Sequence, residues 1–304
     1  MESVIFSVDL EAWHDAAVIK ALQPNVQPNK CTDRIIEPTM WLMDALEHYG
    51  SKATFFVLGR LVKKYPSLIQ MITARGHEVA SHGYDHIPLT ERTYEETVLD
   101  MRKAKESLEQ CIGHRIVGYR APCFSITKAN EWVFDALAET GHLYDSSVYP
   151  FAFHPSYGIK NSPLSPYYAQ SNIVEFPLSC LSVMGTRIPC SGGAYFRWTP
   201  LRFTKHCIDT ITRQNRPFVF YIHPWELDDA QPRVGQMSLK YLRHYSFLTT
   251  TRKKIIDLLE TYKTMSFTEW SLHHPSSIDA PQTDTSAQIL LTPFPNTGNR
   301  LRWE

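Results

Sequence analysis

The chain has 304 residues, of which 43% are hydrophobic and 20% are charged, a composition typical of a folded globular protein and not of a disordered one. Its 31 Lys and Arg residues balance 31 Asp and Glu residues, so the net charge gives no electrostatic case for nucleic acid or an anionic membrane surface as a partner. No apolar run approaches the ~20 residues that a membrane-spanning helix needs.

The first residues, MESVIFSVDLEAW, lack the basic segment, apolar segment and cleavage site of a secretory signal. The six cysteines form no CxxC pair, and in a chain without a signal reduced thiols are the better interpretation. We therefore expect a cytoplasmic protein.

Short apolar segments alternate with longer amphipathic ones along most of the chain. The apolar segments predict strands at 3–9, 52–59, 77–82, 115–122, 142–147, 172–179 and 216–226. The amphipathic segments predict helices at 33–49, 60–76, 93–111, 127–140, 200–214 and about 245–263. The helix at 60–76 is expected to break at Pro66, and the candidate caps are Thr90 or Thr93 for the third helix and Thr127 for the fourth. Strand–helix alternation of this kind argues for a mainly parallel sheet covered by helices.

Five polar residues lie at or just past the carboxyl ends of these predicted strands: Asp9, His82, Arg120, Asp145 and His223. Catalytic residues gather at that end of the strands in α/β barrels. One such placement is expected by chance, whereas five favour an α/β barrel with a single active site.

The predicted barrel spans residues 1–230. Within it, residues 150–200 are rich in proline, which predicts a long loop insertion over the barrel mouth and not a separate domain. Residues 231–273 are expected to be a C-terminal helical extension of the same domain, and 274–304 a Pro-rich tail. We expect the apolar part of this tail to pack on the barrel or on a second subunit, which would make the chain a homo-oligomer; its apolar residues are Ile289, Leu290, Leu291 and Phe294.

The stretch ASHGYDH, residues 80–86, places His82 and His86 four positions apart. On one turn of helix both rings would share a face and could reach one ion. Taken alone, the spacing is more often that of two surface histidines. A carboxylate and other catalytic groups in a matching order are needed to decide.

Seven motifs supply that order: SVDLEAW (7–13), ATFFVLG (53–59), SHGYDH (81–86), GYRAP (118–122), YDSSVYP (144–150), GGAYFR (192–197) and YIHPWE (221–226). With them, residues 3–230 resemble the polysaccharide deacetylase family, the NodB-homology group of carbohydrate esterases. The segment that follows resembles the C-terminal extension of exopolysaccharide-associated members. The resemblance implies a NodB-type distorted (β/α) barrel.

The resemblance also implies one divalent metal ion, zinc by default, held by Glu11, His82 and His86. Family members have adjacent aspartates, base then ligand, where this chain has Asp9-Leu10-Glu11. Alternation along a strand puts Asp9 and Glu11 on one face, so Asp9 maps to the catalytic base and Glu11 to the ligand. Two alternatives stay open: Asp9 could be the ligand and Glu11 the base, or Glu11 could be a surface carboxylate.

By the same resemblance, Arg120 orients Asp9, His223 is the general acid that protonates the leaving amine, and Asp145 tunes that histidine. The usual tryptophan of the Asp145 motif is missing here. Candidate substrate-binding residues are Tyr149, Gly193, Trp225 and Trp13. The alternative for Gly193 is a tight turn without a ligand. The alternative for both tryptophans is simple core packing.

The predicted function is metal-dependent hydrolysis of an N-acetyl group on an amino sugar or glycan, with no nucleic-acid partner. Two alternatives keep the fold. One is hydrolysis of a non-sugar amide or deformylation of an amino sugar, and the other is an inactive glycan-binding barrel. The inactive barrel is disfavoured because the chain keeps all five of the expected residues: Asp9, His82, His86, Arg120 and His223.

Overall fold

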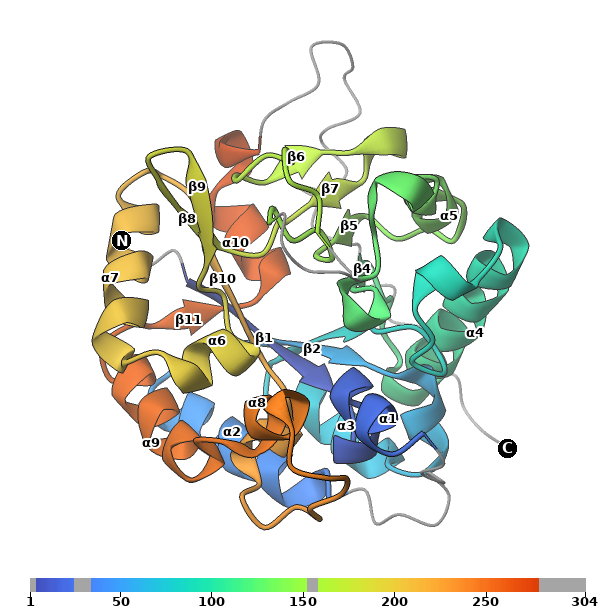
Figure 1. Ribbon diagram of the computed structural model, residues 1–304. Coiled ribbons are helices and arrows are strands. Elements are labelled where there is room, and N and C mark those ends of the chain that lie inside the picture. Colours follow the sequence, from blue (N-terminus) through green and yellow to red (C-terminus); the bar gives the residue numbers. More distant parts are fainter. Residues whose placement is uncertain (1–3, 25–33, 152–157, 279–304) are drawn as a thin grey trace.

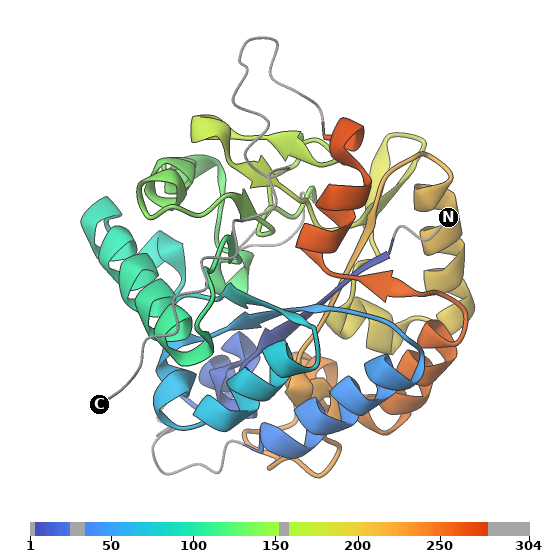
Figure 2. The same cartoon turned by 180° about the vertical axis from the view of Figure 1, so that it is seen from behind.

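The computed structural model describes residues 4–24, 34–151 and 158–278, and its centre is a curled sheet with helices on its outer side (Figures 1 and 2). The sheet runs in the order β10-β1-β2-β3-β4-β5-β7-β6, with β11 also paired to β1. Every pair is parallel except β6 with β7. Since β10 and β6 end the path unpaired with each other, the sheet is an open half-barrel. The strands are β1 (Val4–Leu10), β2 (Thr54–Val57), β3 (Glu78–Ser81), β4 (Gly118–Tyr119), β5 (Tyr144–Asp145), β6 (Tyr167–Tyr168), β7 (Val174–Glu175), β10 (Phe218–Ile222) and β11 (Thr264–Met265).

The remaining strands form a separate hairpin of β8 (Cys180–Val183) and β9 (Thr186–Pro189). The α-helices are α1 (Ala17–Leu22), α2 (Ile36–His48), α3 (Pro66–Ala74), α4 (Tyr94–Ile112), α5 (Val133–Glu139), α6 (Gly193–Trp198), α7 (Leu201–Thr212), α8 (Leu239–Tyr245), α9 (Leu248–Leu259) and α10 (Phe267–His273). Short 3-10 turns include η1 (Trp13–Asp15), η3 (Gly59–Lys63), η5 (Pro122–Phe124) and η8 (Pro224–Leu227). Within the described part of the chain, no helix is both long and apolar enough to cross a bilayer.

Local sequence explains where the helices begin and end. Thr93 caps α4 as predicted: its hydroxyl accepts from the Glu96 N–H, and the Glu96 carboxylate accepts from the Thr93 N–H at 2.9 Å. Gly113, at φ 72°, ends the same helix in the left-handed conformation. The predicted helix at 60–76 divides at Pro66, which takes the first position of α3.

Alternation along β1 sorts its side chains between two cores. Phe6, Val8 and Leu10 belong to the outer core that packs against the surrounding helices. Ile5 belongs to the inner core, in which Phe267 and Trp270 of α10 fill the inside of the curled sheet. Asp9 shares the inward side with Ile5, and this places a carboxylate at the open end of the half-barrel.

Two segments differ from expectation. Residues 150–200 are not a long loop, because β7 joins the central sheet beside β5 and the stretch also contains β6, the β8–β9 hairpin and α6. Val174 and Phe176 are buried in the cores, and this burial outweighs the prolines around them. The His82–His86 stretch is an irregular loop after β3 and not a helical turn, with Gly83 at φ 74° and His86 at φ 56°.

The barrel also does not end at residue 230. Strand β11 pairs with β1, so the C-terminal extension is part of the same sheet. The helix predicted at about 245–263 is α9, and an unpredicted helix, α8, precedes it. The two are divided at Phe247, whose φ is 64°. The predicted contacts of Ile289, Leu290, Leu291 and Phe294 lie outside the described residues.

His77, just before β3, yields a stability prediction. Its ring is buried, and neither ring nitrogen has a hydrogen-bond partner. Burial, with Lys52 and Arg75 nearby, lowers the pKa of His77 from 6.5 to about 4. Neutral His77 therefore contributes stability above about pH 6.5, and this contribution is lost as the pH falls towards 4.

We expect His77→Phe to remove this part of the acid sensitivity. With metal chelated in both proteins, the fall in melting temperature between pH 7 and pH 5 should be smaller in the variant than in the parent chain. An equal fall would show that His77 titrates normally in the folded protein.

Candidate active site

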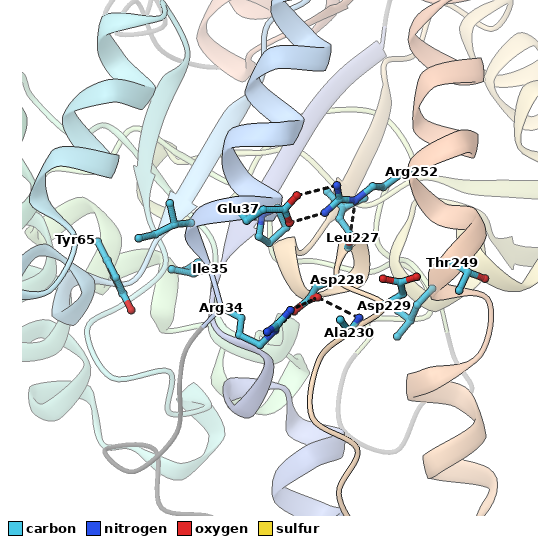
Figure 3. A pocket seen from close by; sticks show the side chains of 13 residues that line it. Arg34, Ile35, Glu37, Tyr65, Leu227, Asp228, Asp229, Ala230, Thr249 and Arg252 are labelled. Atoms are coloured by element: carbon cyan, nitrogen blue, oxygen red, sulfur yellow. Dashed lines mark hydrogen bonds and ion pairs between the residues drawn. The ribbon is translucent and has the colours of Figure 1, made fainter.

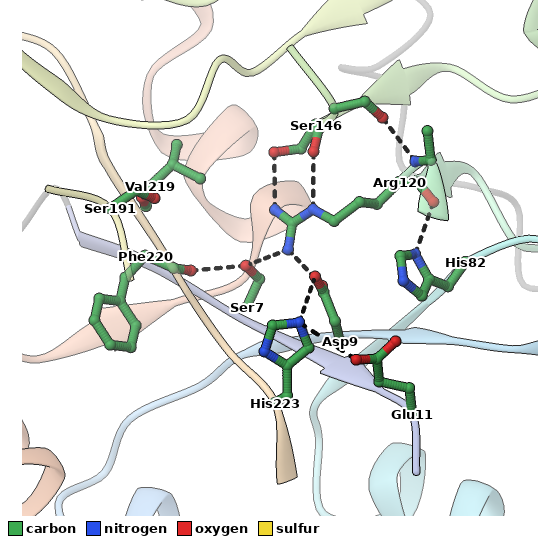
Figure 4. A network of polar contacts seen from close by, with 12 residues as sticks. Ser7, Asp9, Glu11, His82, Arg120, Ser146, Ser191, Val219, Phe220 and His223 are labelled. Atoms are coloured by element: carbon green, nitrogen blue, oxygen red, sulfur yellow. Dashed lines mark hydrogen bonds and ion pairs between the residues drawn. The ribbon is translucent and has the colours of Figure 1, made fainter. Parts of the chain in front are cut away.

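Asp9 and Glu11 leave the end of β1 on the same side and lie buried at the open end of the half-barrel (Figure 4). The Asp9 Oδ1 atom accepts a 2.7 Å bond from Arg120, and its Oδ2 atom lies 3.8 Å from Nε2 of His223. Glu11 meets a different set: Oε2 lies 2.7 Å from His86 Nε2, and Oε1 accepts from the indole N–H of Trp225 at 2.9 Å. The two carboxylates therefore have separate environments.

Arg120, the residue after β4, is fully buried and ties three strands together. Its Nη1 donates to Asp9 and to the Ser7 hydroxyl of β1, while Nε and Nη2 donate to the carbonyl and hydroxyl of Ser146 after β5. The guanidinium also lies 4.1 Å from the ring centroid of Phe56. These contacts fix Asp9 in one orientation, with Oδ2 left facing the site.

His82 and His86 meet Glu11 at this point. One ligand atom from each of the three residues lies within 4.8 Å of the others, and all three side chains are buried. His82 Nδ1 lies 2.8 Å from the Arg120 carbonyl, which can only accept, so this nitrogen carries the proton and Nε2 keeps its lone pair. Burial lowers the pKa of His82 to about 4, which keeps the ring neutral at physiological pH.

The chemistry of this donor set fits a divalent metal ion. Two imidazoles and one carboxylate leave coordination positions for water and substrate, as in catalytic zinc sites. Glu11 Oε2 and His86 Nε2 lie 2.7 Å apart in the buried site, so two possible ligand atoms already converge on the position that an ion would occupy. Burial opposes ionisation of Glu11, but His86 and His223 together lower its pKa, so the carboxylate is charged and able to bind a cation.

His223 follows β10 and faces the two carboxylates through Nε2, 3.6 Å from Glu11 Oε1. Its Nδ1 lies 2.6 Å from Glu226 Oε1, and the other oxygen of Glu226 pairs with Arg197 Nε at 2.6 Å. Burial alone would lower the pKa of His223, but Glu11, Glu226 and Asp9 outweigh it and raise the pKa to about 9. The ring is therefore protonated at neutral pH and can donate from Nε2 into the site.

These groups line one cavity of about 210 Å³. Its wall contains Asp9, Glu11, His82, His86, His223 and Glu226, together with parts of α1, η5, α6 and α8. A base candidate held by an arginine, three candidate metal ligands and a protonated histidine thus face the same space, an arrangement that suits hydrolysis of an amide.

Two family models match this chain. Residues 36–142 match the model of the polysaccharide deacetylase family, and residues 146–272 match a domain of unknown function, DUF3473. The chain contains a polysaccharide deacetylase domain. It has the half-barrel fold of a putative polysaccharide deacetylase from Mycobacterium smegmatis, with a TM-score of 0.62 and 21% identity over 93% of this chain and 94% of that one.

The deacetylase domain also resembles curated relatives over shorter stretches. Identity is 32% over 90 residues to a peptidoglycan-N-acetylglucosamine deacetylase of Listeria monocytogenes, which is 30% of this chain and 19% of the relative. Identity is 35% over 80 residues to a chitooligosaccharide deacetylase of Azorhizobium caulinodans, which is 26% of this chain and 38% of the relative. The alignments thus span well under half of each relative.

Several residues predicted for the site lie elsewhere or have other contacts. Asp145 does not contact His223: its carboxylate accepts from the N–H and hydroxyl of Ser147, and burial raises its pKa together with that of neighbouring Glu175. Glu226 holds the place beside His223 that Asp145 was expected to take. Tyr149 is fully buried outside the cavity wall, with its ring 6.1 Å from that of Phe124.

The two tryptophans are not sugar platforms. The Trp225 ring is stacked between His223, at 4.9 Å, and His244, at 4.5 Å, so both of its faces are covered. Trp13 is buried in a small core cluster with Trp225. Gly193 does line the cavity, but its φ of 55° and the position of Tyr221 Oη, 2.7 Å from where a Cβ would stand, explain the glycine without a ligand.

The sequence motifs contained two residues whose part in the site was missed, Arg197 in GGAYFR and Glu226 in YIHPWE. Glu226 stands three positions after His223 on a turn of 3-10 helix, which is the spacing that brings a carboxylate back to the ring. Arg197 could not be placed from sequence, because its contact with Glu226 joins α6 to η8 across 29 residues.

A larger hollow of about 640 Å³ lies away from these residues (Figure 3). Four of its charged groups form two pairs: Arg34 with Asp228 at 2.5 Å, and Arg252 with Glu37 at 2.6 Å. Of the predicted site residues, none lines this hollow. It offers no metal-ligating cluster among the described residues and carries no chemistry comparable to the smaller cavity.

Removal of the indole N–H at Trp225 is expected to weaken metal binding. Trp225→Phe keeps a ring between His223 and His244 but no longer donates to Glu11, and loss of such a supporting bond costs roughly 10–100-fold in metal affinity. Metal retained after dialysis against competing chelators measures the effect. Trp270→Phe is the matched control, since the buried Trp270 N–H has no partner and should leave affinity unchanged. Equal affinity in both variants would contradict a role for Trp225 in holding Glu11.

Proposed function

We propose that this protein is a metal-dependent hydrolase that removes the N-acetyl group from an amino sugar within a glycan. The observation that carries the proposal is the convergence of Asp9, held by Arg120, and His223, held by Glu226, on the cavity that contains Glu11, His82 and His86. The names of the relatives favour N-acetylglucosamine in peptidoglycan or chitooligosaccharides as the substrate class.

Glu11, His82 and His86 would hold the ion, with zinc favoured by two imidazoles and one carboxylate. When bound, the ion would polarise the acyl oxygen and lower the pKa of water at the site. Trp225 keeps Glu11 oriented, and the Arg120 carbonyl keeps His82 in the tautomer that leaves Nε2 free.

Asp9 would act as the base through Oδ2. Since Oδ1 is engaged by Arg120, the free oxygen is the one that can accept a proton from the attacking water. As water adds to the acetyl carbon and the C–N bond breaks, His223 would give its Nε2 proton to the leaving nitrogen. An amine anion is a very poor leaving group, so the nitrogen must be protonated as it leaves. Glu226 stabilises the protonated His223 ring that supplies this proton.

Amine release from N-acetylglucosamine oligomers and peptidoglycan fragments, measured beside bound metal, tests these assignments. Asp9→Asn and His223→Gln should each lose about 100-fold or more in rate while keeping the metal. Glu11→Gln and His82→Ala should lose metal and activity together. His77→Phe, a change of a buried histidine outside the cavity, should keep both.

If Asp9→Asn lost the metal and Glu11→Gln kept it, Asp9 would be the metal ligand and Glu11 the base. Full activity of either Asp9→Asn or His223→Gln would overturn the proposed chemistry.

Glu226→Gln is expected to shift the pH profile. It removes a negative charge that raises the pKa of His223, so that pKa should fall. Activity that needs protonated His223 declines as the pH rises through its pKa, and the alkaline limb of kcat/KM should therefore move to lower pH. Asp228→Asn changes a nearby carboxylate that pairs with Arg34, and should leave this limb in place. If the alkaline limb lay at the same pH in the parent chain and in Glu226→Gln, Glu226 would not tune His223.

A further inference from the structure

Five large apolar side chains are exposed next to the mouth of the catalytic cavity. They are between 40% and 86% exposed and form what is called here the rim patch: Trp198, Met237, Leu239, Leu242 and Phe247. Trp198 ends α6, and the other four belong to α8 and the residues on either side of it.

The two parts of the rim patch lie side by side. Arg197 donates to the carbonyls of Arg243 and Ser246, which joins the end of α6 to the end of α8, and the rings of Trp198 and Phe247 are 5.5 Å apart. Figure 1 shows α6 and α8 on the near side of the molecule, with α1 beside α8. Other residues of the same two helices line the cavity, among them Gly193, Ala194, Arg243 and His244. The rim patch therefore borders the entrance to the site.

The two segments that carry the rim patch have charged side chains of one sign only, although the whole chain is neutral. Residues 176–208 and 230–256 contain no Asp or Glu. Arg202, Arg233 and Lys240 are exposed in these segments. A surface that combines exposed Leu, Met, Trp and Phe with Lys and Arg has the composition of proteins that rest in the interface of a bilayer.

The same composition argues against other occupants. A glycan chain would stack on Trp198 and Phe247 but would leave Met237 and Leu239 in water. A second copy of the chain would bring like charges together across the contact. Anionic lipid both covers the apolar side chains and attracts each nearby Lys or Arg by about 1 kcal/mol.

We propose that the rim patch docks on an anionic membrane surface, with the mouth of the catalytic cavity turned towards the lipid headgroups. The substrate would then be a glycan held at the membrane. Docking is a property of α6 and α8 alone, and it can be true or false independently of the proposed hydrolysis.

Sedimentation of the full chain with vesicles tests the proposal. Binding is expected to vesicles of phosphatidylcholine mixed with phosphatidylglycerol, not to phosphatidylcholine alone, and should weaken at high salt. Leu239→Ser combined with Leu242→Ser should reduce the affinity about tenfold, by loss of apolar burial. Lys240→Glu should reduce it by about tenfold as well, by reversal of one charge.

Leu99→Ser is the matched control, since Leu99 is an exposed leucine of α4 away from the rim patch. It should bind vesicles as the parent chain does. Lys240→Glu should also keep its activity on soluble oligosaccharides, so a failure of docking is distinguishable from a failure of the catalytic proposal.

Three results would overturn the proposal: no binding to anionic vesicles, equal loss of binding in Leu99→Ser, or binding to an acidic polysaccharide and not to lipid. A dimer in the parent chain that becomes a monomer in the Leu239→Ser, Leu242→Ser variant, without vesicle binding, would also overturn it and make the rim patch a subunit interface.

Discussion

The site depends first on the buried guanidinium of Arg120. Its side chain joins Ser7 and Asp9 of β1 to Ser146 after β5, and its carbonyl accepts from His82. One residue therefore orients the candidate base and fixes the tautomer of a candidate metal ligand. A buried charge is tolerable only when its bonds are satisfied, and here Asp9 supplies the opposite charge while serine oxygens supply the rest.

The rest of the site is assembled from parts of the chain that are far apart in sequence. The candidate metal ligands His82 and His86 come, with Arg120, from the region that matches the polysaccharide deacetylase family. His223, Trp225 and Glu226 come from the region that matches DUF3473. Asp9 and Glu11 precede both regions. Strand β1 lies between β10 and β2 in the sheet, and this position lets its two carboxylates contact both sets of residues. Residues of the DUF3473 region thus form part of the wall of the candidate site.

The C-terminal region has a structural role that its helical pattern does not suggest. Strand β11 pairs with β1, and Phe267 and Trp270 of α10 fill the inside of the curled sheet. Arg197 of α6 donates to carbonyls at the end of α8, and Lys254 of α9 donates to carbonyls at the end of α6. These bonds keep Arg197 in position. Arg197 in turn pairs with Glu226, which contacts His223.

The sequence by itself determined the α/β class, the position of most strands along the chain and the polar residues at the strand ends, because hydrophobic periodicity, caps and strand-end polar residues are local signals. The spacing of Asp9 and Glu11 on one strand predicted that they would share a side, and they do. Only the tertiary structure decided that Glu226 and not Asp145 stands beside His223, that Trp225 is covered on both faces, and that β7 and β11 join the sheet. Each of these depends on contacts between residues distant in sequence, and a two-residue strand such as β11 has too few side chains to show a period of its own.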